Sequence, residues 1–441
     1  MENSSFRDSI KFLYSLQRFG VKLGLDRMGA FLDELGNPHE AYRSIHIAGT
    51  NGKGSTSKFL ESVLRNSGLK VGLYISPHLL EFGERIRIGQ TVIERDYMTQ
   101  WISTMREKIS RLSLTFFEVA TALAFSYFRD MGVEFAICEA GMGGRLDATN
   151  VLSPCAAVIT NIGIDHGQQL GSTKKKIAME KLGIVKELVP IATGETDHSL
   201  LAEHRRVARN NRAPLHVLDE RVEIELSECT MSGTRFSYSS PDTMLEGLHT
   251  TLIGPHQARN AALAIMALET IRDVIYLREE HIRKGLAEAW LPGRFQVIET
   301  PSAKIILDVA HNPSASRALV ETLRLVLPGK EAVVVAGMSS DKDTKNTLGP
   351  IAPIARKFIV SRPDFSRHER KAQAAQLYDV VRDIHGSVSQ VPDIATATSL
   401  GLETVDEKSY MLITGSFYTV AEALSFLRSE GIAVNTGREA S

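Results

Sequence analysis

The sequence predicts an α/β protein with two domains: a larger one built on a mainly parallel sheet with an antiparallel appendage, and a smaller Rossmann-like C-terminal one. Short apolar runs alternate with helical stretches of about 10–15 residues, which is typical of βαβ units and parallel sheets. Residues 214–255 instead alternate apolar and polar side chains between turn residues, a pattern of antiparallel strands. A second α/β series begins after Pro292-Gly293.

The domain boundary is expected in the turn-rich stretch after this dipeptide, which gives domains of residues 1–296 and 297–441. One continuous sheet is the alternative, but the length of 441 residues favours two cores. In the first domain, strands are expected over the short apolar runs 44–48, 71–75, 134–138 and 156–160. Helices are expected from Ser55/Thr56 onward and over the apolar-patterned stretches 117–131 and 256–271. In the second domain, five strands separated by helical sequence are expected over 304–310, 331–337, 357–360, 388–391 and 410–415.

Composition excludes several classes of protein. Lys and Arg number 51 against 52 Asp and Glu, and this balance argues against a nucleic-acid partner or a polybasic membrane surface. The three cysteines are too few for a disulfide framework and lack zinc-site spacing. No apolar run reaches the length of a membrane span or the core of a signal peptide. We therefore expect a soluble, cytoplasmic, monomeric protein that acts on small molecules.

The strongest local pattern is HIAGTNGKGST, which begins at His46 and joins an expected strand to an expected helix. Glycines let backbone N–H groups surround phosphate oxygens, and Lys53 adds a cation for the outer phosphates. The match to G-x-x-x-x-G-K-[ST] is imperfect, because a glycine separates the lysine from the hydroxyl residues. A Gly-rich turn with a surface lysine is the alternative. We expect a P-loop whose ATP ligands are Asn51, Gly52, Lys53, Gly54, Ser55 and Thr56.

A second candidate is Glu139, which ends the apolar run 134–138, because open α/β sheets bind their ligands at the carboxyl ends of strands. Gly141 and the pair Gly143-Gly144 leave room for a ligand beside it, although an ordinary strand-end acid is the alternative. Other polar residues have a plainer explanation when they are taken one by one. Ser76 suits a turn, His166 suits a structural histidine, and Lys181 suits a solvated helix face. Likewise, Arg294 suits a hinge surface, Asp308 an ordinary strand end and His311 a loop. Gln257 and Asn260 lie one helical turn apart, where their amides suit either a nucleotide or a helix cap.

Many ordered segments extend this pattern over nearly the whole chain. GTNGKGS resembles the Mur-type amide-bond-forming ligases, and the surrounding segments resemble their folylpolyglutamate synthase/dihydrofolate synthase branch. The segments are LGLDRM (23–28), LGNP (35–38), SPHLLEFGERIRI (76–88), TFFE (115–118), EAGMGGRLDATNV (139–151), DHGQQLG (165–171), EKLGIVK (180–186), GPHQARNAALA (254–264), LPGRFQVI (291–298), LDVAHNP (307–313), MSSDKD (338–343) and TGSFY (414–418).

The resemblance implies an ATP-dependent ligase with a two-ion Mg²⁺ site, in which Mn²⁺ is an acceptable substitute. It implies that Ser76, Glu139 and His166 hold one ion and that Ser55 touches the second. It also implies a carbamylated Lys181, next to which this chain departs from the family by carrying Leu182 in place of a small residue. The catalytic residues implied are Lys53, Lys181, His166 and His311. Arg294, Asp308 and His311 are implied to close onto ATP from the second domain, with Gln257 and Asn260 completing the nucleotide site.

The folate side of the site follows from the same resemblance. Phe116-Phe117 suit stacking on a flat heterocycle, and Asp147 suits an aminopyrimidine edge. A core aromatic and an N-cap aspartate are the alternatives, and they are favoured without the family. The implied pterin- and folate-binding residues are His78, Leu79, Thr115, Phe116, Phe117, Glu118, Leu146, Asp147 and Ala148.

The expected reaction joins L-glutamate to dihydropteroate and to reduced folates through an acyl phosphate made with ATP. LDATN and LDVAHNP resemble the bacterial enzymes that use both substrates. Folylpolyglutamate synthesis alone is one alternative, and a P-loop switch without ligase activity is another. A switch does not need the set of strand-end acids and histidines. A cell-wall ligase is disfavoured because its UDP-sugar domain usually precedes the loop, and a phosphotransferase because a second closing domain suits three substrates.

Overall fold

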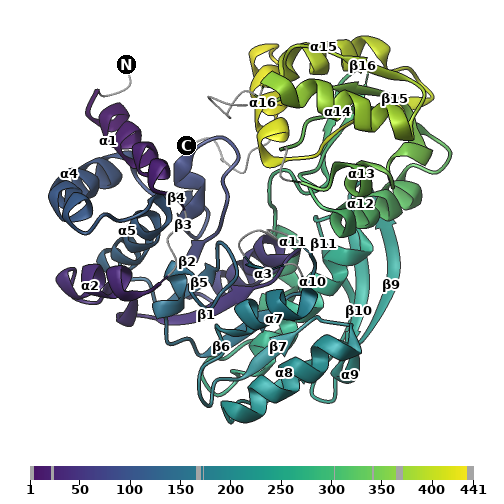
Figure 1. Cartoon of the computed structure of the whole chain (residues 1–441). Helices are drawn as coiled ribbons and strands as arrows, with labels where there is room; N and C mark the ends of the chain where they lie inside the picture. Colours follow the sequence, from purple (N-terminus) through teal and green to yellow (C-terminus); the bar gives the residue numbers. More distant parts are fainter. Residues whose placement is uncertain are drawn as a thin grey trace. The chain divides into compact units, whose positions relative to one another are not determined.

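The computed structural model describes residues 4–20, 24–164, 170–171, 173–301, 303–339, 342–363 and 371–434. The predicted metal ligand His166 lies outside these residues. The chain forms two compact units, the first of Met1–Glu225, Ser237–Leu248 and Arg259–Ala289, the second of Leu226–Phe236, His249–Ala258 and Trp290–Ser441 (Figure 1). The units therefore interleave, whereas the sequence predicts a single boundary between residues 296 and 297.

The first unit is built on an eight-stranded sheet with the order β4-β3-β2-β5-β1-β6-β7-β8. Neighbours from β2 to β8 run parallel, and β3 and β4 continue the sheet antiparallel at one edge. The strands are β1 (Arg43–Ala48), β2 (Val71–Tyr74), β3 (Ile86–Ile88), β4 (Thr91–Val92), β5 (Phe135–Glu139), β6 (Ala156–Ile159), β7 (Ile191–Thr193) and β8 (Leu215–Val217). The four predicted strands are confirmed at the centre of this sheet, where continuous apolar runs are buried on both faces.

The α-helices around this sheet include all three that the sequence predicts. They are α1 (Ser4–Ser15), α2 (Asp26–Glu34), α3 (Lys53–Asn66), α4 (Arg95–Arg111), α5 (Phe116–Asp130), α7 (Lys174–Leu182), α8 (His198–Asn210), α9 (Leu218–Arg221), α10 (Pro255–Glu269) and α11 (Glu279–Glu288). Helix α3 starts at Lys53, two residues before the predicted start. It packs closely on α11, because a Cβ on Gly285 would lie only 2.5 Å from Val63 Cα.

A separate three-stranded sheet, with the order β11-β10-β9, confirms the predicted appendage. Its strands are β9 (Glu223–Thr230), β10 (Gly233–Ser239) and β11 (Met244–Thr250). Connections this short join only antiparallel neighbours, because a parallel pair needs a long crossover. Alternation along β10 buries Phe236 and Tyr238 on one face and leaves Arg235 exposed on the other.

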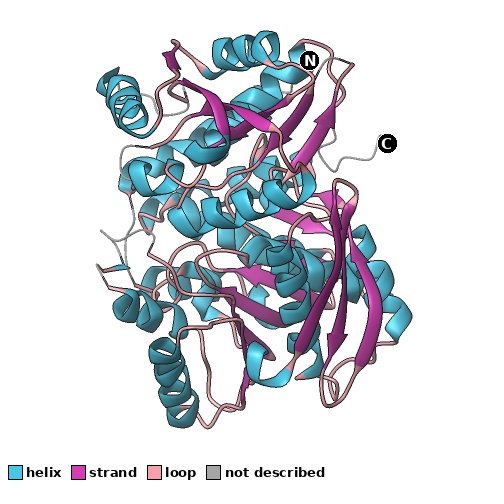
Figure 2. Ribbon diagram, turned by 90° about the vertical axis from the view of Figure 1, so that its right-hand side faces the viewer, coloured by secondary structure: helices cyan, strands magenta, loops and turns pink. Residues whose placement is uncertain are grey.

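The second unit contains a six-stranded sheet with the order β12-β13-β17-β14-β15-β16, parallel except for β12. The strands are β12 (Gln296–Glu299), β13 (Lys304–Leu307), β14 (Glu331–Ala336), β15 (Ala355–Val360), β16 (Val388–Gln390) and β17 (Ser409–Thr414). The helices are α12 (Pro313–Val326), α13 (Thr344–Leu348), α14 (Lys371–Ile384), α15 (Ile394–Thr404) and α16 (Phe417–Ser429). All five predicted strands are confirmed. Figure 2 shows helices packed beside the strands.

Candidate active site

The phosphate loop joins β1 to α3 and takes a conformation that glycine permits. Gly49 and Gly52 have φ of 153° and 84°, values that other residues rarely adopt. Both also lie against polar side chains: a Cβ on Gly52 would come within 2.5 Å of Asn260 Oδ1, and one on Gly49 would overlap Thr160 Oγ1. The predicted amide Asn260 on α10 therefore lies directly beside the loop.

Residues at the end of β6, which were not singled out from the sequence, hold the loop in place. Thr160 Oγ1 and Asn161 Nδ2 donate to the carbonyl oxygen of Asn51, at 2.7 and 3.1 Å. The Asn51 N–H donates in turn to Asn161 Oδ1, at 3.0 Å. Thr50 Oγ1 exchanges hydrogen bonds with the backbone of Gly163. Their position directly after a central strand, beside a Gly-rich loop, was the available signal. These hydrogen bonds thus fix the backbone of the loop that is expected to surround phosphate.

Three predicted residues meet where β5, β2 and α3 come together. Lys53 Nζ lies 3.7 Å from Glu139 Oε1, and Glu139 is nearly fully buried. The backbone N–H of Ser76 donates to Glu139 Oε2 over 3.3 Å. This arrangement puts a carboxylate, a hydroxyl residue and a cation at the carboxyl end of the parallel strands, which is where such sheets bind ligands.

The oxygen atoms at this place suit a hard divalent cation. Glu139 and Ser76 supply carboxylate and hydroxyl groups, the ligand chemistry that Mg²⁺ and Mn²⁺ prefer. Ser55 and Thr56 are buried in the first turn of α3, and Thr56 Oγ1 has no hydrogen-bond partner among the described residues. Over the described part of the chain, no three His, Cys, Asp or Glu side chains cluster as metal ligands. Among the described residues, the candidate ligands at this place are the carboxylate of Glu139 and the hydroxyls of Ser76, Ser55 and Thr56.

Lys181 is buried, contrary to the solvated helix face that its spacing favours. Its side chain is on the buried side of α7, with Ile177, Ala178 and Leu182, and only 5% of the residue is exposed. Lys181 Nζ donates to the carbonyl oxygen of Gly49 over 2.6 Å. A lysine far along the chain thus supports the first residue of the phosphate loop.

The predicted residues Thr115 and Glu118 cap the start of α5. Glu118 N–H donates to Thr115 Oγ1, and Thr115 N–H donates to the Glu118 carboxylate, which forms a capping box. Glu118 also pairs with Arg27 at 3.1 Å. The sequence T-x-x-E was a signal for the box, and Arg27 belongs to the segment LGLDRM.

The two predicted aromatic residues have different surroundings. The Phe116 ring stacks on Tyr14, with centroids 5.6 Å apart and planes at 15°, and the Arg85 guanidinium lies 5.3 Å from its centroid. The Phe117 ring packs on Gly141, where a Cβ would come within 2.4 Å of the ring. Glycine at position 141 therefore makes room for Phe117 beside the strand end that carries Glu139.

His78 and Leu79 belong to a partly buried hydrogen-bonded group around the turn after β2. Arg85 Nε donates to His78 Nδ1 over 2.7 Å, and His78 Nε2 lies 3.1 Å from Tyr14 Oη. Burial and the positive charge of Arg85 lower the pKa of His78 to about 3, so the imidazole is neutral at physiological pH. The Leu79 N–H donates to Glu84 over 2.8 Å. Tyr14, Arg85 and Glu84 were not singled out from the sequence.

Asp147 is an N-cap, as the alternative reading of its sequence position predicts. Its Oδ1 accepts from the N–H and hydroxyl of Thr149, and its Oδ2 accepts from the N–H of Met142. Burial raises the pKa of the carboxyl, although these hydrogen bonds oppose the shift. Leu146 is half-buried and Ala148 is buried on either side of it.

The second unit brings Arg294, which precedes β12, close to Asp308 and His311, which follow β13. Asp308 accepts the backbone N–H groups of Phe295 and Ala310 at 2.8 and 2.9 Å. Burial raises the pKa of Asp308, and the nearby charge of Arg294 opposes the shift. Arg294 lies 5.0 Å from the centroid of the Phe417 ring, and the ring of His311 lies 6.0 Å from it. Phe417, which belongs to the segment TGSFY, was not named from the sequence. Gln257 is buried near the start of α10.

Comparison with known proteins matches both parts of the chain to Mur ligase domains. Residues 47–268 match the Mur ligase middle domain, and residues 293–417 match the Mur ligase, glutamate ligase domain. The chain is 35% identical to the dihydrofolate synthase/folylpolyglutamate synthase of Bacillus subtilis, over 95% of this chain and 98% of the relative. It is 33% identical to the protein of that name from Escherichia coli, over 95% and 94%. Folylpolyglutamate synthase of Lacticaseibacillus casei is 33% identical, over 94% and 96%.

Solved structures agree with the sequence relatives. Folylpolyglutamate synthase of Thermotoga maritima superposes with a TM-score of 0.84 at 34% identity, with 98% of each chain covered. Escherichia coli FolC in complex with DHPP and ADP superposes with a TM-score of 0.86 at 30% identity, covering 96% of this chain and 98% of that one. The chain therefore belongs to the Mur ligase family, in the branch of the dihydrofolate synthases and folylpolyglutamate synthases.

Proposed function

We propose that this protein is an ATP-dependent ligase that joins L-glutamate to dihydropteroate, forming dihydrofolate, and to reduced folates, extending their γ-glutamyl chain. The observation that carries the proposal is the approach of Lys53 on the phosphate loop to Glu139 at the end of β5, 3.7 Å apart. This pair lies within the residues that match the Mur ligase middle domain. Relatives named for both activities cover nearly the whole chain.

The chemistry proceeds in two displacements. A carboxylate oxygen of the pterin-bearing substrate attacks the γ-phosphorus of ATP, and ADP leaves with the electrons of the broken P–O bond. The amine of L-glutamate then attacks the carbonyl carbon of the acyl phosphate, loses a proton and expels inorganic phosphate. Lys53 contributes by neutralising charge on the phosphates, and the backbone N–H groups of the loop orient them.

We propose that Ser76, Glu139 and His166 hold one Mg²⁺ ion, that Ser55 touches a second, and that Mn²⁺ can replace Mg²⁺. The hydroxyl and carboxylate chemistry of the described residues supports this assignment. When bound, the ions supply positive charge that offsets the charge on the phosphates. One solved relative, of 34% identity, is described as bound to Mn, AMPPNP and L-glutamate.

Lys181 is proposed to carry a carbamate. Its burial and its hydrogen bond to Gly49 support the assignment, because carbamylation requires a neutral amine and burial disfavours the charged ammonium form of a lysine. Lys53, Lys181, His166 and His311 remain the proposed catalytic residues.

The nucleotide site is proposed to include Arg294, Asp308 and His311 in addition to the phosphate loop, Gln257 and Asn260. Support comes from the cluster around Phe417, where a planar guanidinium and an imidazole lie near a strand end. Pterin and folate are proposed to bind along the segments of His78, Leu79, Thr115–Glu118 and Leu146–Ala148. The aromatic and hydrogen-bonded groups around Phe116 and His78 support that assignment.

We also propose that the enzyme works as a monomer in the cytoplasm. Cys138, Cys155 and Cys229 are unpaired thiols, as is usual in a reducing compartment. In the part of the chain that the model describes, no helix has the length and apolar character needed to cross a bilayer.

The proposal is tested by measuring ADP release by the pure protein with Mg-ATP and L-glutamate, with dihydropteroate or tetrahydrofolate added in parallel. Stimulation by both substrates is the expected result. Stimulation by tetrahydrofolate alone would reduce the function to folylpolyglutamate synthesis, an activity for which the Lacticaseibacillus casei relative is named. Nucleotide binding without stimulation by either would favour a nucleotide switch.

A further inference from the structure

Three buried side chains connect the centre of the large sheet to the loop that follows β5. His46 lies on β1, which pairs with β5 on one side and β6 on the other. His46 Nε2 is 2.8 Å from Thr149 Oγ1, and Thr149 Oγ1 donates to Asp147 Oδ1 over 2.6 Å. His46 and Thr149 are fully buried and Asp147 is 6% exposed, so water does not compete for these hydrogen bonds.

The direction of the hydrogen bonds determines which imidazole nitrogen carries the proton. Asp147 accepts from several donors, as a carboxylate does, so the hydroxyl proton of Thr149 points toward it. The Thr149 oxygen can then only accept from His46, which places the proton on Nε2. His46 Nδ1 has no hydrogen-bond partner among the described residues, so no acceptor there favours a proton on that nitrogen.

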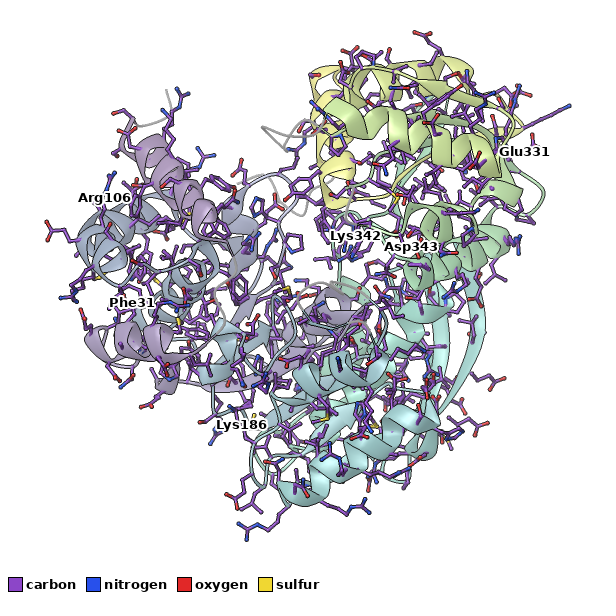
Figure 3. All side chains as sticks on the ribbon, in the orientation of Figure 1. Phe31, Arg106, Lys186, Glu331, Lys342 and Asp343 are labelled. Atoms are coloured by element: carbon purple, nitrogen blue, oxygen red, sulfur yellow. The ribbon has the colours of Figure 1, made fainter. Side chains whose placement is uncertain are left out.

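The surroundings of His46 keep the ring neutral. Lys186, labelled in Figure 3, is half-buried after α7 and donates from Nζ to the carbonyl oxygen of Asn150 over 2.9 Å. Burial and this positive charge lower the pKa of His46 to about 3. The imidazole therefore holds one proton and one orientation over the physiological pH range.

At the other end of the chain of hydrogen bonds, Asp147 shapes the loop. It accepts from the N–H groups of Met142 and Thr149 and has a further backbone hydrogen bond with Gly141. Gly141 in turn packs against the ring of Phe117. The carboxylate thus fixes both ends of the turn that carries Leu146 and Ala148.

We propose that His46 and Thr149 are positioning residues for the pterin-bearing substrate: their hydrogen bonds hold Asp147, and Asp147 holds the 141–149 loop in the shape that binds this substrate. The inference rests on the proposed function, because it takes the loop as part of the folate side of the site. It assigns a role to a histidine in the strand before the phosphate loop, separate from ATP binding.

Steady-state kinetics with paired variants test this role. Thr149→Val removes the hydroxyl at constant volume and is expected to raise KM for dihydropteroate about tenfold, the scale of one lost charge-assisted hydrogen bond. KM for ATP is expected to stay within about twofold, and Thr149→Ser to restore the wild-type value within about threefold. Equal rises in both KM values, or an unchanged KM for dihydropteroate, would overturn the proposal.

A second pair covers the case in which Thr149→Val does not fold. In His46→Gln the side-chain amide takes the place of Nε2 and can still donate, whereas in His46→Asn it lies near Nδ1 and cannot reach Thr149. His46→Gln is expected to keep the wild-type KM for dihydropteroate, and His46→Asn is expected to raise it. Identical behaviour of the two variants would contradict the proposal.

Nitrogen-15 NMR of the histidine rings separates this inference from the proposed function. In the wild-type protein at pH 7, the His46 resonance, assigned with the glutamine variant, is expected to show a protonated Nε2 and a bare Nδ1. A protonated Nδ1 would overturn the chain of hydrogen bonds even in an active enzyme. Absence of amide formation by the wild-type protein would instead refute the proposed function, and the substrate role of the loop with it.

Discussion

The two units each place an acid where a parallel strand ends, but they surround it differently. Glu139 ends β5 and faces the Lys53 ammonium and the Ser76 N–H. Asp308 follows β13 and accepts two backbone N–H groups, from Phe295 and Ala310, which are the neighbours in sequence of Arg294 and His311.

The difference shows that the same position in an α/β fold can serve two purposes. Glu139 faces the Lys53 ammonium and the Ser76 N–H, in the proposed phosphate and metal site, so we expect its charge to matter most. Asp308 accepts from the backbone of two turns, so we expect its ability to accept two hydrogen bonds to matter most. The neighbouring residues Arg294 and His311 are the ones proposed to bind ATP. Charge-removing variants should therefore affect the two sites differently.

The largest expected effect is that of Lys53→Ala. Removing the cation from the phosphate loop should lower turnover by up to about a thousandfold, the scale of lost electrostatic stabilisation of a transition state, while the fold remains intact. Amide formation and thermal melting measure the two properties. Lys174→Ala, at an exposed lysine paired with Asp197, is the matched control. A folded Lys53→Ala enzyme with near-normal turnover would refute the phosphate-loop assignment.

The second-largest effect is expected for Glu139→Gln. The amide keeps the shape of the side chain but removes its charge, so we expect about a hundredfold lower turnover and a rise in the Mg²⁺ concentration needed for half-maximal rate. Glu134, which precedes the same strand and accepts from the N–H of Lys70, supplies the control Glu134→Gln. If both variants respond alike to Mg²⁺, the strand-end acid has no special role in metal use.

Asp308→Asn should have a smaller and mixed effect. Its amide can accept only one of the two N–H groups and presents its own N–H to the other, at a cost of about 1–3 kcal/mol in the free energy of unfolding. KM for ATP should rise about tenfold, because the turns beside Arg294 and His311 loosen. Asp393→Ala, which removes the N-cap of α15, is the control for losing a cap in the same unit. A rise in KM for ATP in the control as well would indicate a general loss of stability.

The smallest effect is a pH dependence of stability that comes from His78. Its pKa is about 3 in the folded protein, below the ordinary value of 6.5, so the unfolded chain takes up the proton first as pH falls. The contribution of His78 is complete above pH 6.5 and declines toward pH 3, with a loss of about 2 kcal/mol at pH 5. Urea unfolding at pH 7 and pH 5 measures it. His78→Gln should lose less stability than the wild type between these pH values, and an equal loss would show that His78 is not held neutral.

The centre of each sheet could be predicted from sequence because buried parallel strands are continuous apolar runs. The edge strands β3 and β4, of three and two residues, carry too little pattern to be recognised. The phosphate loop and Glu139 were predictable because glycines and a strand end mark them.

Lys181 was not predictable from spacing, because its burial depends on which face of α7 packs inward. The capping role of Asp147 could be anticipated, whereas its hydrogen-bonded connection to His46 could not. That connection joins residues about 100 positions apart, and only the fold brings them together. Short sequence motifs therefore predict local features such as the phosphate loop or a helix cap. Hydrogen bonds between residues on distant segments become visible only in the fold.

The central claim is that ATP activates a carboxylate as an acyl phosphate, and oxygen transfer tests it most directly. Dihydropteroate labelled with oxygen-18 in its carboxylate would be incubated with Mg-ATP, L-glutamate and the wild-type protein. If the acyl phosphate forms, each phosphate released with an amide product carries one labelled oxygen. Unlabelled phosphate, or label found in AMP, would contradict it.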